Sequence, residues 1–219
     1  MEKKGFIFDL DGVIVDTAKY HYLAWKELAN QLGIDFTEQH NELLKGVSRV
    51  KSLDILLGIG DVILTDEEKR EYMEQKNIRY LAYVAKMDES EILPGIQELL
   101  SFLKDNNIPF SLGSASKNAR VILQGVNLLD AFTAIVDGND VSKAKPDPEV
   151  FLIAAKKLNL KPENCIVIED AAAGIEAAHR AQMKSVGIGE EDMLGKADIL
   201  LSSTSELTID LAKQLLKSQ

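Results

Sequence analysis

Short runs of consecutive apolar residues recur along the chain, and most are followed by polar residues and then by a helical pattern. Continuous apolar runs are typical of strands buried on both faces of a parallel sheet, whereas strands with one solvent-facing side alternate. The runs lie at residues 5–8, 108–112, 134–136, 165–168 and 185–188. We therefore predict a parallel strand at each of them.

The segments between these runs have apolar residues at helical spacing. One stripe follows Pro94, and a second runs from Val150 to Leu158 after two prolines. Proline is tolerated in the first turn of a helix, so its position favours helix starts at these points. The first stripe consists of Ile96, Leu99, Leu100 and Leu103. Strands that alternate with helices predict an α/β fold with a doubly wound, mostly parallel sheet and right-handed crossovers.

Residues 16–87 interrupt this alternation, because they contain no convincing strand. Apolar positions from Tyr20 to Leu32 have helical spacing and end at Gly33, and Thr65 with Glu68 forms a capping-box pattern. We predict that 16–87 is an all-helical cap domain inserted into an α/β core made of 1–15 and 88–219. The alternative is that these helices simply pack on the sheet.

Composition narrows the classes of protein that fit. Of 219 residues, 46% are hydrophobic and 27% charged, which is enough for a sizeable core, and the formal net charge is −10. Such an acidic chain argues against nucleic acid as a partner. No stretch reaches the roughly eighteen apolar residues of a membrane span, and Asp9 interrupts the first apolar run before a secretory signal can form. We therefore expect a cytoplasmic monomer without membrane contact, in which the single cysteine, Cys165, is a small buried residue.

Acidic residues follow two of the predicted strands. Asp9 and Asp11 come after the first, and Glu169 and Asp170 after the fourth. Ligands of open α/β sheets bind beyond the carboxyl ends of the strands, where these side chains are expected to meet. If the extended geometry continues, Asp9 and Asp11 leave the chain on the same side. An oxygen-rich cluster without His or Cys suits Mg²⁺; the alternative for each acid alone is a helix cap.

Two further groups can bind an anion. Ser114, Ser116, Lys117 and Asn118 lie together before a predicted helix, where hydroxyl and backbone N–H groups favour phosphate. Lys145 lies in a segment stiffened by two prolines and can neutralise a carboxylate and a phosphate oxygen. The alternatives are that Ser116 only caps the helix and that Lys145 is solvated.

Taken together, these motifs resemble the signature of the haloacid dehalogenase-like phosphotransferases. The matching parts are DLDGV at 9–13, Ser114, KPDP at 145–148, and the pair Glu169 and Asp170. The resemblance covers nearly the whole chain and includes a helical insert after the first strand. It implies an aspartyl-phosphate enzyme that uses Mg²⁺.

Segments 16–21, 24–25, 44–49 and 114–118 more closely resemble the sugar-phosphate mutases of this family. That resemblance implies a sugar phosphate substrate, namely interconversion of beta-D-glucose 1-phosphate and glucose 6-phosphate through a beta-glucose 1,6-bisphosphate intermediate. The run of alanines at 171–173 and the loop at 59–62 depart from the pattern. Galactose or allose phosphates fit the same motifs.

The resemblance also assigns roles. Asp9 is expected to be the nucleophile and Asp11 the general acid and base, while Ser114 and Lys145 assist catalysis. The metal is expected at Asp9, the backbone carbonyl of Asp11, Glu169 and Asp170. The expected substrate-binding residues are His21, Trp25, Lys45, Gly46, Val47, Arg49, Lys76, Ser116, Lys117 and Asn118.

Two other functions use the same residues. A Mg²⁺-dependent phosphatase of small phosphorylated metabolites requires the catalytic residues but no second phosphate site, so Arg49 and the segment 116–118 discriminate it from a mutase. A non-catalytic Mg²⁺- or phosphate-binding regulator is the third possibility, because fold alone does not determine function.

Overall fold

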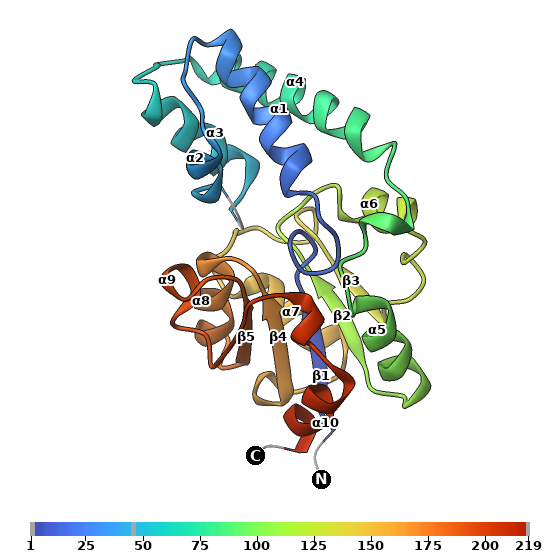
Figure 1. Cartoon of the computed structure of the whole chain (residues 1–219). Coiled ribbons are helices and arrows are strands. Elements are labelled where there is room, and N and C mark those ends of the chain that lie inside the picture. The colour runs from blue at the N-terminus through green and yellow to red at the C-terminus, as the bar shows by residue number, and fades with distance from the viewer. Residues whose placement is uncertain (1–2, 45–46, 218–219) are drawn as a thin grey trace.

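The computed structural model describes residues 3–44 and 47–217. Its centre is a six-stranded parallel sheet in the order β3-β2-β1-β4-β5-β6 (Figure 1). The strands are β1 (Gly5–Phe8), β2 (Phe110–Gly113), β3 (Ala134–Val136), β4 (Cys165–Glu169), β5 (Lys184–Ile188) and β6 (Ile199–Leu201). The doubly wound sheet confirms the predicted fold class. The edge strand β6 was not predicted, although its apolar run is as long as that of β3.

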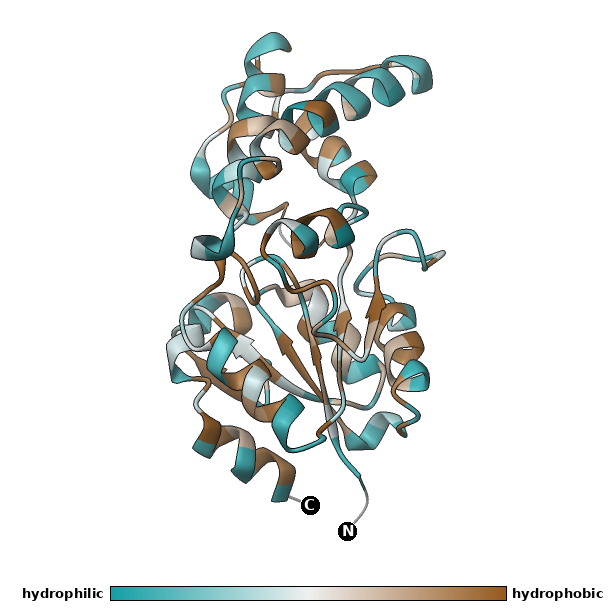
Figure 2. Cartoon of the chain, turned by 90° about the vertical axis from the view of Figure 1, so that its right-hand side faces the viewer, coloured by the Kyte–Doolittle hydropathy of each residue, from teal (hydrophilic) through white to brown (hydrophobic). Residues whose placement is uncertain are grey.

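Helices cover both faces of the sheet (Figure 1). They are α5 (Ile96–Asp105), α6 (Ala119–Gly125), α7 (Glu149–Lys157), α8 (Ala172–Arg180), α9 (Glu191–Leu194) and α10 (Ile209–Lys217). Short 3₁₀ turns occur at Glu89–Glu91, Pro162–Asn164 and Thr204–Glu206. Figure 2 shows apolar strands between helices whose outer faces are polar.

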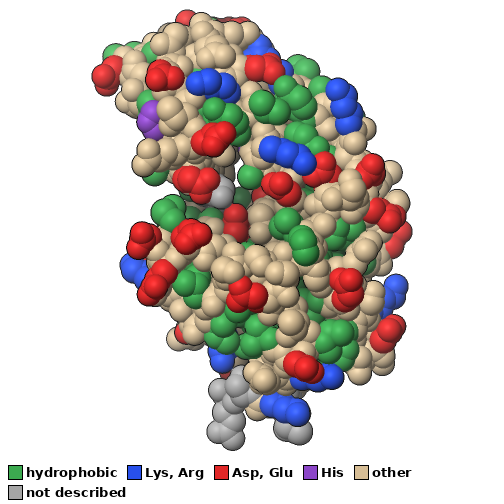
Figure 3. Space-filling view, in the orientation of Figure 1, with side chains coloured by type: hydrophobic (Ala, Val, Ile, Leu, Met, Phe, Trp, Pro, Cys, Tyr) green, Lys and Arg blue, Asp and Glu red, His purple; other side chains and the backbone are tan. Residues whose placement is uncertain are grey.

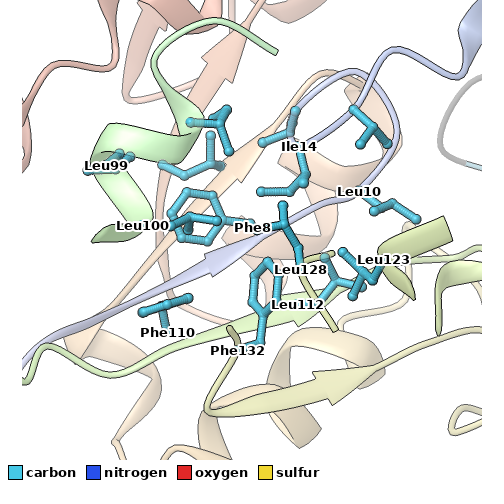
Figure 4. Packing of buried hydrophobic residues seen from close by; sticks show 14 of the residues in the cluster. Phe8, Leu10, Ile14, Leu99, Leu100, Phe110, Leu112, Leu123, Leu128 and Phe132 are labelled. Carbon is cyan, nitrogen blue, oxygen red and sulfur yellow. The ribbon is translucent and has the colours of Figure 1, made fainter. Parts of the chain in front are cut away.

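Successive residues of β1 serve opposite faces of the sheet. Phe6 and Phe8 belong to the apolar cluster shared with α5, α6 and α10, whereas Ile7 belongs to the cluster formed with α7 and α8. Figure 4 shows Phe8 among Leu99, Leu100 and Leu112 in the first cluster. All four residues of β1 are buried, which explains why its sequence is continuously apolar.

Between β1 and β2 the described residues form four helices beyond the carboxyl ends of the strands (Figure 1). They are α1 (Ala18–Gln31), α2 (Glu38–Glu42), α3 (Arg49–Ile59) and α4 (Asp66–Val84). Thr65 caps α4 and forms the capping box with Glu68, as the sequence predicts. These helices have an apolar cluster of their own, which includes Trp25, Phe36 and Leu56.

Tyr80 and Val84, at the end of α4, belong instead to the large cluster of the sheet and its helices. The four helices are therefore anchored on the sheet at one end and pack on one another at the other.

Two smaller findings concern membrane contact and cysteine chemistry. Within the described residues, every helix is too short or too polar to cross a membrane. Cys165 is buried in β4, and burial raises the pKa of its thiol to about 12, so it is a core residue and not a nucleophile.

Candidate active site

A cavity of about 590 Å³ lies between the four inserted helices and the carboxyl ends of the strands. Figure 3 shows the molecule hollowed at this level. Its floor includes Asp9 and Ser114, which follow β1 and β2, while Arg49 of α3 and Lys76 of α4 lie on the opposite wall. The cavity therefore brings together residues from distant parts of the sequence.

Lys145 lies beneath the floor of the cavity, between two carboxylates. Its ammonium nitrogen Nζ is 2.6 Å from Oδ1 of Asp9 and 2.5 Å from Oε1 of Glu169. All three residues are buried. Although burial alone would lower it, the two adjacent carboxylates raise the pKa of Lys145, so the lysine stays charged and compensates the acids.

Asp9, Glu169 and Asp170 form a carboxylate cluster that can hold a metal ion. Each offers one carboxylate oxygen, and these oxygens lie within 4.8 Å of one another. The second oxygen of Glu169 accepts a hydrogen bond from the backbone N–H of Ala171 at 2.8 Å. Both Glu169 oxygens thus already have protein partners, whereas Asp170 lines the cavity. Oxygen ligands of this kind suit a hard divalent cation.

Two glycines make room for these acids. Gly12 has φ +78°, and a Cβ built on it would collide with the carboxylate of Asp170. A Cβ on Gly174, in the first turn of α8, would collide with the carboxylate of Glu169. The sequence needs glycine at both positions because each acid approaches the backbone closely.

Asp11 lies outside the carboxylate cluster. The extended geometry of β1 ends at Phe8, and the chain then turns so that Asp11 pairs with Val15 in an isolated bridge. The condition for Asp9 and Asp11 to leave the chain on the same side, a strand that continues past Phe8, is therefore not met. The Asp11 carboxylate instead accepts a hydrogen bond from the hydroxyl of Thr17. Desolvation and the nearby Asp9 raise the pKa of Asp11 to about 6.

His21 on α1 and Lys76 on α4 form a chain of contacts that leads from Asp11 to the inserted helices. Nε2 of His21 lies 3.8 Å from Oδ1 of Asp11, and Nδ1 lies 3.0 Å from Nζ of Lys76. Lys76 is buried, with its ammonium 4.8 Å from the ring centre of Trp25. Burial and then the positive charge of Arg49 lower the pKa of Lys76 to about 7, and burial followed by Lys76 holds that of His21 well below its usual range.

The segment from Ser114 to Asn118, which follows β2, also lines the cavity. The Ser114 hydroxyl accepts from the Ser116 N–H at 3.1 Å, and the Ser116 hydroxyl accepts from the Asn118 N–H at 3.2 Å. The loop after β3 supports it, because the Gly138 N–H donates to the Ser116 carbonyl at 3.2 Å. This segment is held in place by short local hydrogen bonds.

Arg49 and Asn118, the last residue of this segment, share one hydrogen-bond acceptor. Oδ1 of Asn77, on α4, accepts a hydrogen bond from Nη2 of Arg49 at 2.7 Å and from Nδ2 of Asn118 at 2.9 Å. Burial lowers the pKa of the Arg49 guanidinium, but arginine side chains stay protonated in proteins, so Arg49 carries a positive charge.

The described residues predicted for the site therefore lie in one place. Those that line the cavity are Asp9, Asp11, His21, Trp25, Val47, Arg49, Lys76, Ser114, Ser116, Lys117, Asn118 and Asp170. Lys145 and Glu169 lie directly behind Asp9. Lys45 and Gly46 were also predicted and lie outside the described residues.

Comparison with known proteins identifies the family. The model of the haloacid dehalogenase-like hydrolases matches residues 3–182. The chain belongs to this family. It is 47% identical to a beta-phosphoglucomutase of Bacillus subtilis over 95% of this chain and 93% of that protein. It is 31% identical to a phosphorylated carbohydrates phosphatase of Thermotoga maritima, covering 82% of each chain.

A solved structure gives the same result for this member of the haloacid dehalogenase-like family. The crystal structure of a beta-phosphoglucomutase from Clostridium difficile matches with a TM-score of 0.93 and 45% identity, over 98% of this chain and 97% of that one. Both the sheet and the inserted helices therefore have counterparts in that protein.

The sequence analysis missed several residues of the cavity in this family member. Arg70, Met73 and Glu74 line it from α4, and Asn41 and Ser52 line it from α2 and α3. Positions 70, 73, 74 and 77 have i, i+3, i+4, i+7 spacing and form one face of the helix. This mixed, largely polar stripe could have indicated a helix face that lines a cavity. It was missed because an apolar stripe predicts burial directly, whereas a polar stripe is also typical of a solvent-exposed face.

Proposed function

We propose that the protein is a phosphomutase that interconverts beta-D-glucose 1-phosphate and glucose 6-phosphate through an aspartyl-phosphate and a beta-glucose 1,6-bisphosphate intermediate. The similarity to the beta-phosphoglucomutases of B. subtilis and C. difficile supports this function.

The observation that carries the proposal is that the cavity has two separate groups suited to phosphate. One, on the floor, consists of Asp9, Ser114 and Lys145. The other consists of Arg49 on α3 and the segment 116–118, which follows β2. A hexose bisphosphate has a phosphate at each end, and a planar guanidinium can bind one of them through two parallel hydrogen bonds.

Asp9 is proposed as the nucleophile. Its carboxylate oxygen attacks phosphorus, forming an acyl phosphate while the bond from phosphorus to the sugar oxygen breaks. Asp11 protonates the leaving sugar oxygen and, in the second half of the cycle, removes the proton from the hydroxyl that receives the phosphoryl group. A carboxyl whose pKa is about 6 can both donate and accept a proton near neutral pH.

Mg²⁺ is the proposed cofactor, held by Asp9, Asp170 and the backbone carbonyl of Asp11. Glu169 would lie behind the metal ligands and would not bind the ion directly, because its two oxygens already accept hydrogen bonds from Lys145 and from the backbone N–H of Ala171. The donor set consists of oxygen atoms, and Gly12 has no side chain to fill the space beside Asp170. When bound, the ion would neutralise charge on the phosphoryl group.

We also propose that 16–87 acts as a cap on a core made of 1–15 and 88–219. His21, Trp25, Val47 and Lys76 line the cavity from this segment. Closure of the cap over a bisphosphate would keep water away from the acyl phosphate, which favours transfer to the sugar over hydrolysis.

A phosphatase acting on small phosphorylated metabolites is the competing function, and the relative from T. maritima has that activity in its name. A product assay discriminates the two. The protein is incubated with beta-glucose 1-phosphate, Mg²⁺ and a trace of the bisphosphate, and glucose 6-phosphate and inorganic phosphate are both followed. We expect glucose 6-phosphate to dominate; release of phosphate as the main product would contradict the mutase.

Replacing Arg49 tests the second phosphate group. Loss of a hydrogen bond to a charged group weakens binding by about 10- to 100-fold, so Arg49→Ala should lower mutase kcat/KM by about that factor. Hydrolysis of acetyl phosphate, which has one phosphate, should change less than about twofold. Arg70→Ala removes another arginine of the cavity wall and serves as the matched control. Equal losses of both activities in Arg49→Ala would refute the proposed site.

A further inference from the structure

A single oxygen atom joins the two parts of the proposed second phosphate group. Oδ1 of Asn77 accepts hydrogen bonds from Arg49, in the inserted helices, and from Asn118, in the segment after β2. Arg49 and Asn118 are separated by almost seventy positions in the sequence. Their donor nitrogens are held within two hydrogen-bond lengths of each other because they share this acceptor.

Asn77 itself is not one of the described residues that line the cavity, whereas Arg49 and Asn118 are. Asn77 lies on the same helical face as Arg70, Met73 and Glu74, one turn nearer the sheet. Its amide contacts the two side chains from the end of this face nearer the sheet, without lining the cavity itself.

The contacts leave donors available for a ligand. A guanidinium has five N–H groups and a carboxamide two, and Asn77 uses one from each residue. Among the described residues, no carboxylate forms an ion pair with Arg49 within 4.0 Å. Most of its N–H groups thus remain available to an anion while Asn77 stays in place, although the negative charge of Glu74 on the cavity wall also acts on the guanidinium.

We propose that Asn77 is a positioning residue, which orients Arg49 and Asn118 as one preformed binding site for the non-transferring phosphate of the substrate. This inference rests on the proposed mutase function. A site whose donors are already oriented loses less conformational freedom when the ligand binds, so affinity rises without any contact between Asn77 and the ligand. The hydrogen bond from Asn118 also joins the inserted helices to the core, whereas that from Arg49 joins α3 to α4.

The test replaces Asn77 by a residue of similar size that accepts no hydrogen bond. In Asn77→Leu, Arg49 and Asn118 lose their common acceptor. We expect KM for beta-glucose 1-phosphate and for the bisphosphate primer to rise about tenfold, with a smaller change in kcat. Hydrolysis of acetyl phosphate should stay within about twofold of the wild type, because Asp9, Ser114 and Lys145 are untouched.

Asn77→Asp provides a second, independent variant. It keeps the acceptor oxygens and adds a negative charge next to Arg49, so the thermal stability should equal or exceed that of the wild type. KM for the bisphosphate should nevertheless rise, because the carboxylate competes with phosphate for the guanidinium. A merely structural role would not raise KM while leaving stability intact. The matched controls are Gln75→Leu and Gln75→Glu, which change an exposed amide on the same helix.

A double-mutant cycle shows whether Asn77 acts through its two partners. In an Arg49→Ala, Asn118→Ala background, the additional replacement Asn77→Leu should change KM by less than about twofold. Unchanged KM in the single variant Asn77→Leu, or an undiminished effect in that background, would overturn the inference. The result is separable from the proposed function, because a wild-type protein that releases only phosphate refutes the mutase before any variant is measured.

Discussion

The ammonium of Lys145 lies between the carboxylates of Asp9 and Glu169, and all three residues are almost inaccessible to solvent. A buried carboxylate without a partner is costly, and two such groups also repel each other. Lys145 therefore has a structural task as well as a proposed catalytic one. The same lysine keeps the Asp9 carboxylate oriented at the floor of the cavity.

Replacement of Lys145 should affect both stability and activity. Removing one member of a buried ion pair costs about 3–5 kcal/mol, so Lys145→Met should lower the free energy of unfolding by that amount in urea titrations. Phosphoryl transfer should also be lost. Lys143→Met is the matched control, because the Lys143 side chain is 71% exposed. A change below about 1 kcal/mol, typical of exposed ion pairs, would contradict the assigned pairing.

A glycine beside the acids makes the second prediction at this scale. In Gly12→Ala, the new Cβ collides with Asp170 and φ is +78°, so we expect a loss of roughly 1–3 kcal/mol and weaker Mg²⁺ binding by titration calorimetry. Gly58→Ala, on α3, is the control. A Cβ there meets nothing within 4 Å, so stability should rise by up to about 1 kcal/mol. Unchanged Mg²⁺ affinity in Gly12→Ala would argue against a metal at Asp170.

At the scale of elements, α4 is the most informative segment. Its start was predicted from the sequence, because Thr65 and Glu68 form the capping box by themselves. The face that it presents to the cavity was not predicted. Lys76 was placed in the site only by resemblance, and the contact from Asn77 to Asn118 depends on the angle between a helix and a loop 41 positions away. Local patterns contain no information on that angle.

Buried Lys76 predicts a pH dependence of stability. Its pKa is about 7 in the folded protein against 10.5 when unfolded, so between these values the unfolded chain binds more protons. The free energy of unfolding should therefore increase as pH rises from 7 to 10.5. Below pH 7 the buried charge of Lys76 lowers this free energy by its full amount.

Lys76→Met removes this cost. The variant should be more stable than the wild type by a few kcal/mol at pH 7, with the difference shrinking toward pH 10, as measured by thermal unfolding at several pH values. Lys86→Met, at an exposed position just beyond α4, should show no such trend. A difference that does not vary with pH would mean that Lys76 titrates normally.

At the scale of the whole molecule, the sheet explains why the sequence revealed so much of the site. Asp9, Ser114, Glu169 and Asp170 all follow or end parallel strands, and such strands bring their carboxyl ends to one edge. The pattern of apolar runs was therefore sufficient to predict their proximity. The end of β1 at Phe8 was predicted, but the turn that separates Asp11 from the carboxylate cluster was not, because Val15, which pairs with Asp11, also pairs with the distant Ile92.

The four inserted helices complete the molecule by covering this edge. They supply Arg49, His21 and Lys76 to a cavity whose floor is acidic, so the chain is negative overall but has the positive charge of Arg49 where phosphate would bind. The proposed reaction depends on this arrangement, because the proposed nucleophile Asp9 lies on the floor and Arg49 on the opposite wall.

The central claim is that Asp9 receives the phosphoryl group. Borohydride reduces an aspartyl phosphate to homoserine, so the protein is mixed with the bisphosphate and Mg²⁺, quenched, reduced, digested and sequenced by mass spectrometry. We predict homoserine at position 9, and its absence in Asp9→Asn. Homoserine at another aspartate, or an unlabelled Asp9 in protein that turns over substrate, would contradict the account.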